Sequence, residues 1–434
     1  MSAQTIGQHA QKASRTTALL STEAKNTILL AIAERLEEHS AAIIEANEKD
    51  LLRAKNNNLE AGFIDRLTLD EKRIAQLVKS IQNVITLKDY VGELLEARVR
   101  EDGLSLKRVR VPLGVILMIY EARPNVTVDA ACLALKSGNA VILKGGSEAL
   151  ETNKKLVEIM RSVLAEIGGT EPEHNLVDAV QLISGTDRNL THELLQLDRL
   201  IDVVIPRGGK GLINFVKENS RVPIIETGAS VVHTYIHEAA DISKAVAIAM
   251  NAKLRRTSIC NTLDTLIVDS KIAGEFLAAF LEALDKNPYH ADHLEIRADE
   301  NAYALLKKNP QPHGCNIHIK KAMEEDFDTE FLDYILAIKT VNSFDEALAH
   351  IRAHSLKHSE AIVTEQSHVA EQFIKEVDAA CVYWNASTQF SDGGEFGLGA
   401  EIGISTQKLH VRGPFALEGL TTYKWIVEGN GHIR

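Results

Sequence analysis

The sequence predicts an α/β protein with two doubly wound parallel sheets and a small flap. Short apolar runs alternate with helical patterns from residue 112 to about 226, and the alternation returns from about 229 to 384. Such alternation implies parallel strands joined by right-handed crossovers. Between them, residues 98–111 alternate around an Asp-Gly turn, which indicates a hairpin.

The breaks in these patterns predict the domain boundaries. Residues 1–97 and 112–228 are expected to form a nucleotide-binding domain, and residues 229–387 a catalytic domain. The remaining residues, 98–111 and 388–434, are expected to form an oligomerisation flap and a site-closing loop, because the tail is rich in glycine and ends in a strand pattern.

The individual elements follow from periodicity. Apolar residues at helical spacing predict one or two helices over 21–57 and another over about 65–85. Later helices are expected at 126–136, 148–167, 188–195 and 210–217. Strands are expected at 115–120, 140–143, 180–183, 203–205, 231–236, 263–268, 334–338, 360–364, 381–384 and near 421–427.

Composition excludes several classes of protein. The chain has 434 residues and a net charge of −12, with no basic cluster of the kind that binds nucleic acid. No apolar run approaches the length of a membrane span, and the first residues lack the apolar segment of a secretory signal. Four scattered cysteines without metal-ligand spacing indicate a reducing compartment, so we expect a cytoplasmic protein.

One of these cysteines is a candidate nucleophile. Cys260 lies between a helical stretch that carries Lys253, Arg255 and Arg256 and a strand. Nearby cations or a helix end can lower the pKa of a thiol from about 8.5, and the thiolate is the reactive form. A buried structural cysteine is the alternative, and these local features leave both interpretations open.

Two strand–turn–helix segments could bind an anion or a ribose. Residues 141–148 read VILKGGSE and residues 202–211 read DVVIPRGGKG. Each offers backbone N–H groups and a helix N-terminus, although neither is the GxGxxG dinucleotide motif. A plain tight turn is the alternative. The candidate residues are Lys144, Gly145, Gly146, Ser147, Gly208 and Gly209.

Further polar residues follow strands. Glu226 precedes a glycine turn and could act as a general base, or it could be a solvated loop residue. Arg123 could bind an anionic substrate group. Asn125 could donate to a developing oxyanion, but capping of a helix is the role we expect.

Three histidines invite a metal interpretation that we do not favour. His350, His354 and His358 recur every four residues, which would place them on one helix face. No carboxylate or cysteine completes the set, so the sequence predicts a solvated histidine face and no metal.

Long motifs resemble a known family over nearly the whole chain. They include VPLGVILMIYEARPNVTVDAACLALKSGNAVILKGGSEA, PIIETGASVVHTY, NAKLRRTSICN and FGLGAEIGISTQKLHVRGPFALEGLTTYKWIVEGNGHIR. These segments resemble the gamma-glutamyl phosphate reductases of the aldehyde dehydrogenase superfamily. The resemblance implies an aldehyde-dehydrogenase-like fold and NADPH-dependent reduction of L-glutamyl 5-phosphate to L-glutamate 5-semialdehyde, in proline biosynthesis.

The same resemblance implies roles for single residues. Cys260 matches the nucleophile, Lys144 the lysine that contacts the adenosine ribose, and Glu226 the general base. Glu330 falls where a glutamate holds the nicotinamide ribose. The oxyanion-stabilising asparagine of common aldehyde dehydrogenases lies in a different motif, so Asn125 is a candidate only.

Substrate and partners follow from the same reasoning. The phosphate and carboxylate of the substrate are expected to meet Arg123, Arg255 and Arg256. A homo-oligomer is expected, and glutamate 5-kinase is a candidate partner that would hand over the labile acyl phosphate. Residues 228–232 depart from the family pattern, in which a second glycine and often a cysteine occur, and the departure is expected to alter packing and not chemistry.

Other functions remain open at this stage. A cysteine acylphosphatase or thioesterase could use Cys260 with Glu226 to activate water, and a phosphate-independent aldehyde dehydrogenase would carry the same nucleophile. A catalytically inactive partner of the kinase is a third possibility, which the retention of Cys260 and its flanking cations disfavours.

Overall fold

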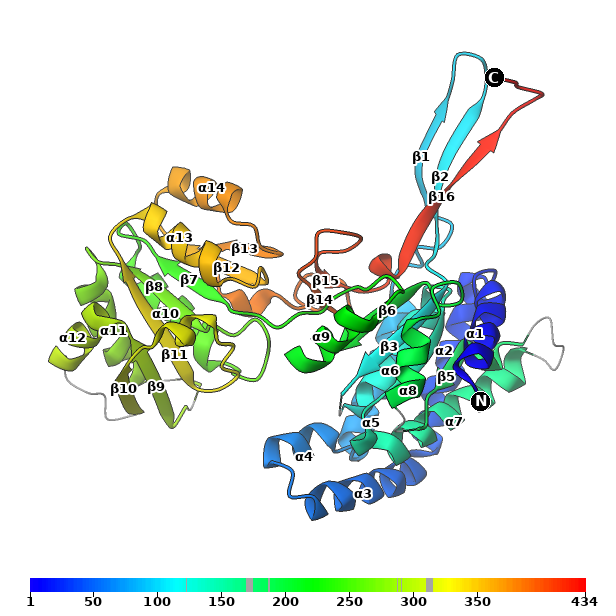
Figure 1. Cartoon of the computed structure of the whole chain (residues 1–434), viewed down its shortest axis with the longest axis horizontal. Coiled ribbons are helices and arrows are strands. Elements are labelled where there is room, and N and C mark those ends of the chain that lie inside the picture. Colours follow the sequence, from blue (N-terminus) through cyan, green and yellow to red (C-terminus); the bar gives the residue numbers. More distant parts are fainter. Residues whose placement is uncertain (122, 169–174, 186–187, 287, 290, 310–314) are drawn as a thin grey trace. The chain divides into compact units, whose positions relative to one another are not determined.

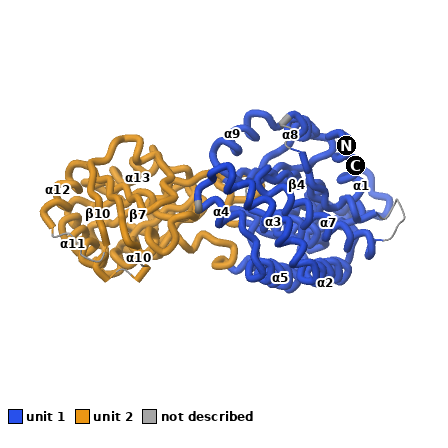
Figure 2. The backbone as a smooth tube through the Cα atoms, turned by 90° about the horizontal axis from the view of Figure 1, so that it is seen from below, with its two compact units in different colours: residues 1–227, 397–403, 415–434 blue, residues 228–396, 404–414 orange. Residues whose placement is uncertain are grey.

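The chain divides into two compact units, each of which is described by itself. The computed structural model describes residues 1–434 except 122, 169–174, 186–187, 287, 290 and 310–314 (Figure 1). Unit 1 holds Met1–Thr227, Gly397–Gly403 and Phe415–Arg434, and unit 2 holds Gly228–Phe396 and Ile404–Pro414 (Figure 2).

A four-stranded parallel sheet forms the centre of unit 1. Its order is β5-β4-β3-β6. All six residues of β3 are buried, because its VILMIY sequence is apolar on both faces. The strands are β3 (Val115–Tyr120), β4 (Ala140–Lys144), β5 (Val180–Leu182) and β6 (Val203–Arg207).

Polar side chains cap the N-termini of helices in unit 1. Ser21 caps α2 and Asp70 caps α5 through their side chains. The single helix predicted at 65–85 is wrong, because Asp70 starts a new helix, and α1 was not predicted. The helices are α1 (Ala3–Thr17), α2 (Thr22–Glu38), α3 (Ser40–Asn56), α4 (Ala61–Leu67), α5 (Glu71–Thr86), α6 (Pro124–Lys136), α7 (Leu150–Gly168), α8 (Arg188–Leu195) and α9 (Lys210–Asn219).

A three-stranded antiparallel sheet, which we call the arm, completes unit 1. Its strands are β1 (Leu94–Val99), β2 (Ser105–Pro112) and β16 (Thr421–Glu428), in the order β1-β2-β16 (Figure 1). Gly103 takes a φ of +88° in the turn, a conformation that suits glycine. The predicted hairpin is confirmed, although it begins earlier, at Leu94.

Unit 2 is built on a seven-stranded parallel sheet of order β10-β9-β11-β8-β7-β12-β13. Alternate residues of one strand pack on opposite faces: Leu266 joins one core cluster and Ile267 the other. The strands are β7 (His233–Ile236), β8 (Thr265–Asp269), β9 (His293–Ala298), β10 (Asn316–Lys321), β11 (Ile335–Val341), β12 (Ser359–Val363) and β13 (Cys381–Trp384).

Helices cover both faces of this sheet. They are α10 (Ile242–Leu254), α11 (Ala273–Leu284), α12 (Glu300–Lys308), α13 (Phe344–His354) and α14 (Ser367–Glu376). Strands β9 and β10 were not predicted. Two short strands, β14 (Gly403–Ser405) and β15 (Gly413–Phe415), lie in the tail.

The predicted fold class, two parallel α/β sheets with a small flap, is confirmed. In the part of the chain that the structure describes, no helix is long and apolar enough to cross a membrane.

Candidate active site

Cys260 lies in a turn between α10 and β8 of unit 2. Cys260 is half-buried, whereas Cys132, Cys315 and Cys381 are buried. All four cysteines are free thiols. Among the cysteines, Cys260 is the one that a substrate could reach without opening a core.

Side chains from other segments hold the backbone of the Cys260 turn. Thr262 Oγ1 and Gln389 Nε2 donate to the carbonyl of Arg256 at 2.7 and 3.0 Å. Thr388 Oγ1 donates to the carbonyl of Asn261 at 2.7 Å, and Ser230 Oγ donates to that of Cys260 itself. Because the turn has no regular secondary structure, these bonds fix its conformation.

The cations expected near Cys260 are engaged in other ways. Lys253 is fully buried and donates to the carbonyl of Leu263 at 3.0 Å. Burial lowers the pKa of its ammonium to about 8. Arg255 donates from Nε to Gln389 Oε1 at 2.9 Å, and Arg256 is exposed. Both guanidinium groups therefore remain candidates for a phosphate.

Two carboxyl groups with raised pKa values lie near the turn. Glu330 Oε1 is 3.0 Å from Ser230 Oγ. Burial raises the pKa of Glu330 to about 7, and the charge of Asp264 adds to the rise. Burial raises the pKa of Asp264 to about 6, against the lowering effect of Lys253 and of N–H donors from Phe331 and Val232. Glu330 can therefore be either charged or neutral near neutral pH.

In unit 1, the first glycine turn presents Lys144 at the end of β4. Its ammonium donates to the carbonyl of Gly145 at 3.0 Å, and burial lowers its pKa. A Cβ on Gly145 would lie 2.4 Å from Asn153 Nδ2, so packing within the unit requires this glycine. Ser147 begins a 3-10 helix (Ser147–Ala149) after Gly146, without a side-chain cap bond. Lys144, Ser147 and the start of this helix suit a ribose or a phosphate.

The second glycine turn holds a residue that sequence reasoning missed. The Glu121 carboxylate accepts the N–H of Gly209 at 3.0 Å, where α9 begins. A Cβ on Gly208 would lie 2.6 Å from Glu121 Cδ. An anion could bind this N–H only after Glu121 moves away. Knowledge of the strand pairing would have revealed this contact, because Glu121 follows β3 and Arg207 ends the adjacent parallel strand β6.

Two other predicted residues of unit 1 lie outside regular strands. Glu226 accepts a charged hydrogen bond from Lys217 Nζ at 3.0 Å and is 18% exposed at its side chain. This ion pair argues against a solvated loop glutamate. Arg123 is exposed and occupies the N-cap position of α6.

The predicted capping role of Asn125 is wrong. Arg123 is the N-cap residue of α6 and Pro124 follows it, so Asn125 lies inside the first turn. Its Nδ2 donates to Asp129 Oδ2 at 3.2 Å. Burial raises the pKa of Asp129. The oxyanion role of Asn125 stays a prediction.

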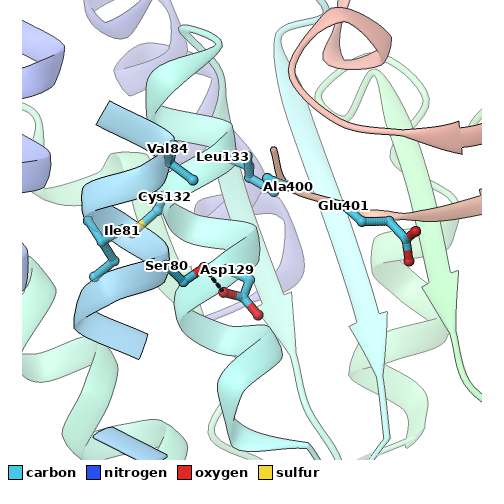
Figure 3. A pocket seen from close by; sticks show the side chains of 8 residues that line it. All are labelled: Ser80, Ile81, Val84, Asp129, Cys132, Leu133, Ala400 and Glu401. Carbon is cyan, nitrogen blue, oxygen red and sulfur yellow. Dashed lines mark hydrogen bonds between the residues drawn. The ribbon is translucent and has the colours of Figure 1, made fainter. Parts of the chain in front are cut away.

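Asp129 also lines a small pocket in unit 1. Figure 3 shows the pocket between α5 and α6, with the Ser80 hydroxyl 3.4 Å from Asp129 Oδ1. Its volume is about 90 Å³. Ligand pockets usually measure about 300–1,000 Å³, so this pocket is too small for a dinucleotide.

The predicted solvated histidine face is also wrong. Helix α13 ends at His354, so His358 lies outside it, and His358 is fully buried. The ring of His350 packs against those of His354 and Phe327, with centroid separations of 4.4 and 5.1 Å. Burial lowers the pKa of His350 to about 2. No cluster among the described residues suits a metal ion, and the absence of a metal stays a prediction.

Comparisons with known proteins assign the family. The model of the aldehyde dehydrogenase family matches residues 2–298. Gamma-glutamyl phosphate reductase of Caldanaerobacter subterraneus subsp. tengcongensis is 47% identical over 434 residues, which is 100% of both chains. The chain belongs to the aldehyde dehydrogenase family, among the gamma-glutamyl phosphate reductases.

Solved structures agree with this assignment. The crystal structure of gamma-glutamyl phosphate reductase from Thermotoga maritima has a TM-score of 0.92 and 44% identity, and the match covers 100% of both chains. An acetylating aldehyde dehydrogenase from Geobacillus thermoglucosidasius has a TM-score of 0.66 at 18% identity, covering 100% of this chain and 97% of that one, and shares the fold. The resemblance inferred from the motifs is confirmed.

Proposed function

We propose that this chain reduces L-glutamyl 5-phosphate to L-glutamate 5-semialdehyde and phosphate, the second step of proline biosynthesis from glutamate. One observation carries the proposal: Cys260, which the resemblance makes the nucleophile, is a half-buried thiol in a turn that side-chain hydrogen bonds hold, whereas the other three cysteines are buried. An acyl phosphate is already activated, so the chain needs a nucleophile, cations for the phosphate and a hydride donor.

The covalent route balances as follows. The Cys260 thiolate attacks the acyl carbon, the bond from carbon to the phosphate oxygen breaks, and phosphate leaves with the electron pair. The product is a thioester on Cys260. When bound, the nicotinamide dinucleotide supplies a hydride to the thioester carbon. The resulting hemithioacetal releases the aldehyde and regenerates the thiolate. Arg123, Arg255 and Arg256 are proposed to bind the phosphate and the substrate carboxylate.

The cofactor is a nicotinamide dinucleotide, and we propose NADPH. Lys144 offers an ammonium at the end of β4, and Ser147 adds a hydroxyl at the start of the following helix. These donors suit the adenosine ribose and its phosphate. The turn at Gly208 and Gly209 would hold a phosphate oxygen once Glu121 has left it. Glu330 is proposed to hold the nicotinamide ribose.

Two further residues are proposed to act in catalysis. Glu226, which pairs with Lys217, is proposed as the general base that takes the proton of the thiol. The Asn125 amide has a second N–H beyond the one that it gives to Asp129, and this N–H is the proposed donor to the oxyanion.

The alternative functions are not favoured. A cysteine hydrolase has no use for a nicotinamide dinucleotide, and the full-length relatives are named as reductases. Phosphate dependence in the oxidative direction would separate this enzyme from a phosphate-independent aldehyde dehydrogenase.

A second copy of the chain is the proposed partner of the arm. Val99, Tyr423, Trp425 and Val427 are between 43% and 70% exposed, and β1 and β16 each have one unpaired edge among the described strands. Exposed apolar side chains on an edge strand favour association with another chain. Sedimentation of wild type and Trp425→Glu tests this proposal. Transfer of the acyl phosphate from glutamate 5-kinase stays a prediction.

The deciding experiment is the reverse assay with glutamate semialdehyde, phosphate and NADP⁺. Cys260→Ser replaces a thiolate by a hydroxyl that is barely ionised, so turnover should fall on the order of a thousandfold or more. Cys315→Ser is the matched control, because Cys315 is buried, and its turnover should stay near that of wild type. Near-normal turnover of Cys260→Ser, or an activity that does not need phosphate, would contradict the proposal.

A further inference from the structure

Ser230 stands between the nucleophile and a titratable carboxyl group. Ser230 is fully buried. Its hydroxyl contacts both the backbone carbonyl of Cys260 and Glu330 Oε1, the latter at 3.0 Å. All three residues belong to unit 2.

The two contacts compete for one hydrogen. A serine hydroxyl carries a single donor proton. It can donate to the Cys260 carbonyl or to an ionised Glu330, but not to both. When Glu330 is protonated, its own O–H can donate to Ser230 Oγ, and Ser230 then donates to Cys260. In this second arrangement the Ser230 hydroxyl accepts from Glu330 and donates to the Cys260 carbonyl, so both of its hydrogen bonds are kept.

We propose that Ser230 is a positioning residue for Cys260, and that the charge of Glu330 decides whether Ser230 holds the Cys260 carbonyl. The inference rests on the proposed function only in making Cys260 the nucleophile. With Glu330 neutral, the carbonyl is held and the thiol keeps one orientation. With Glu330 ionised, Ser230 turns to the carboxylate and the turn loses one of its hydrogen bonds.

The Cys260 carbonyl is the point of the turn where such control can act. The carbonyls of Arg256 and Asn261 are held by Thr262, Gln389 and Thr388, whose side chains do not titrate. Ser230 is the donor among these that also contacts a carboxyl group.

The surroundings of Glu330 place its titration near neutral pH. Burial and the Asp264 charge raise its pKa, whereas the hydroxyl and the backbone N–H of Ser230 lower it. Asp264 is itself held by the N–H groups of Phe331 and Val232 and balanced by Lys253. Both charge states of Glu330 are therefore populated at the pH at which a biosynthetic enzyme works.

The test is the rate at which iodoacetamide alkylates Cys260 in the full chain, without substrate or cofactor, from pH 5.5 to 8.5. Peptide mass spectrometry follows the Cys260 peptide. Leaving the cofactor out separates this role from the proposed contact between Glu330 and the nicotinamide ribose. After correction for ionisation of the thiol, the wild-type rate should change by about 2- to 10-fold across pH 7, the factor that corresponds to one hydrogen bond.

Two variants each hold the protein in one of the two states, with the Cys260 carbonyl bonded to residue 230 or not bonded to it. Glu330→Gln cannot ionise and its amide can donate to Ser230, so its corrected rate should stay at the low-pH value of wild type. Ser230→Ala lacks the donor, so its corrected rate should stay at the high-pH value. Adding Glu330→Gln to Ser230→Ala should change nothing further. Ser258→Ala, an exposed serine in the same turn, is the control and should follow wild type.

The proposal is overturned if Ser230→Ala follows the wild-type profile, or if Glu330→Gln still shows the change near pH 7. Should Ser230→Ala fail to fold, the flat profile expected of Glu330→Gln still decides the matter. Turnover of Ser230→Ala with glutamate semialdehyde is measured separately, with kcat expected to fall and KM to stay within about threefold. An inactive wild type would refute the proposed function and leave the alkylation result standing.

Discussion

His358 should make unit 2 sensitive to acid. It lies just before β12 with 0% exposure; its Nδ1 is 2.9 Å from Ser359 Oγ, and its Nε2 has no partner among the described residues. Burial lowers the pKa of its imidazole to about 4. A proton on this ring would leave a charge in the core without a partner.

The direction and size of the change in the free energy of unfolding follow from the pKa of His358 in the folded chain and in the unfolded chain. In the unfolded chain the imidazole titrates near 6.5, so the unfolded state binds the proton first. The stability that the neutral ring provides is complete above pH 6.5 and is lost as pH falls from 6.5 to about 4. Each pH unit in that window costs about 1.4 kcal/mol, which amounts to about 2 kcal/mol between pH 7.5 and 5.0.

Other buried groups titrate in the same pH window, so the slope of the free energy of unfolding against pH does not report on His358 alone. His350 has a pKa lowered in the same direction. Glu330 and Asp264 have raised pKa values, so the folded state protonates them before the unfolded state does. These two groups therefore increase the free energy of unfolding as pH falls. The informative quantity is therefore the difference in slope between wild type and His358→Gln.

The assay uses a tryptophan that reports on this sheet. Trp384 lies in β13, which pairs with β12, and the other tryptophan is Trp425 in the arm. In a Trp425→Phe background, urea unfolding followed by fluorescence gives the free energy of unfolding for the region of β12 and β13.

Between pH 7.5 and 5.0, His358→Gln should lose about 2 kcal/mol less of this free energy than its parent. His318→Gln is the control, since His318 is exposed in β10 of the same sheet, and it should keep the parental slope. Equal slopes for His358→Gln and its parent, within about 0.5 kcal/mol of free energy of unfolding, would refute the argument.

Three further predictions concern the two glycine turns and the buried thiols. Lys144→Ala should raise the KM for NADPH well above the change in the KM for substrate, and an unchanged cofactor KM would remove Lys144 from the site. Glu121→Gln removes a carboxylate that competes for the Gly209 N–H, so NADPH should bind severalfold tighter in a fluorescence titration; unchanged binding would mean that no phosphate reaches that turn. Cys132→Ser places a hydroxyl in a core position and should lower the free energy of unfolding by about 1–3 kcal/mol while kcat stays near wild type; a loss of kcat without a loss of stability would contradict this.

The sequence predicted the fully buried strands well and missed two partly exposed neighbouring strands, β9 and β10. Strands β3 and β8 are buried along their whole length, so they appear as continuous apolar runs. Strand β10 is an edge strand and β9 lies beside it, and exposed and buried positions alternate in β9. Their sequences, HLEIRA and NIHIKK, contain charged or polar residues that hide the strand signal from a search for apolar runs.

The site was predictable where chemistry is local and not where it depends on pairing between distant segments. Cys260 is recognisable from its own neighbourhood, and the motifs assign its family. Glu121 reaches the turn of another strand, which requires knowing that β3 and β6 are adjacent. Ser230 lies in the segment that departs from the family pattern, and its hydroxyl bonds to the carbonyl of Cys260, 30 residues away in the sequence.

The arm also has a consequence for synthesis on the ribosome. Strand β16 pairs with β2 from Thr421↔Pro112 to Glu428↔Ser105, a separation of more than 300 residues. The hairpin of β1 and β2 leaves the exit tunnel long before its third strand exists, and all of unit 2 is translated in between. Until then the free edge of β2 can pair with a neighbouring nascent chain. A chain truncated before residue 421 would keep that exposed edge for its whole lifetime.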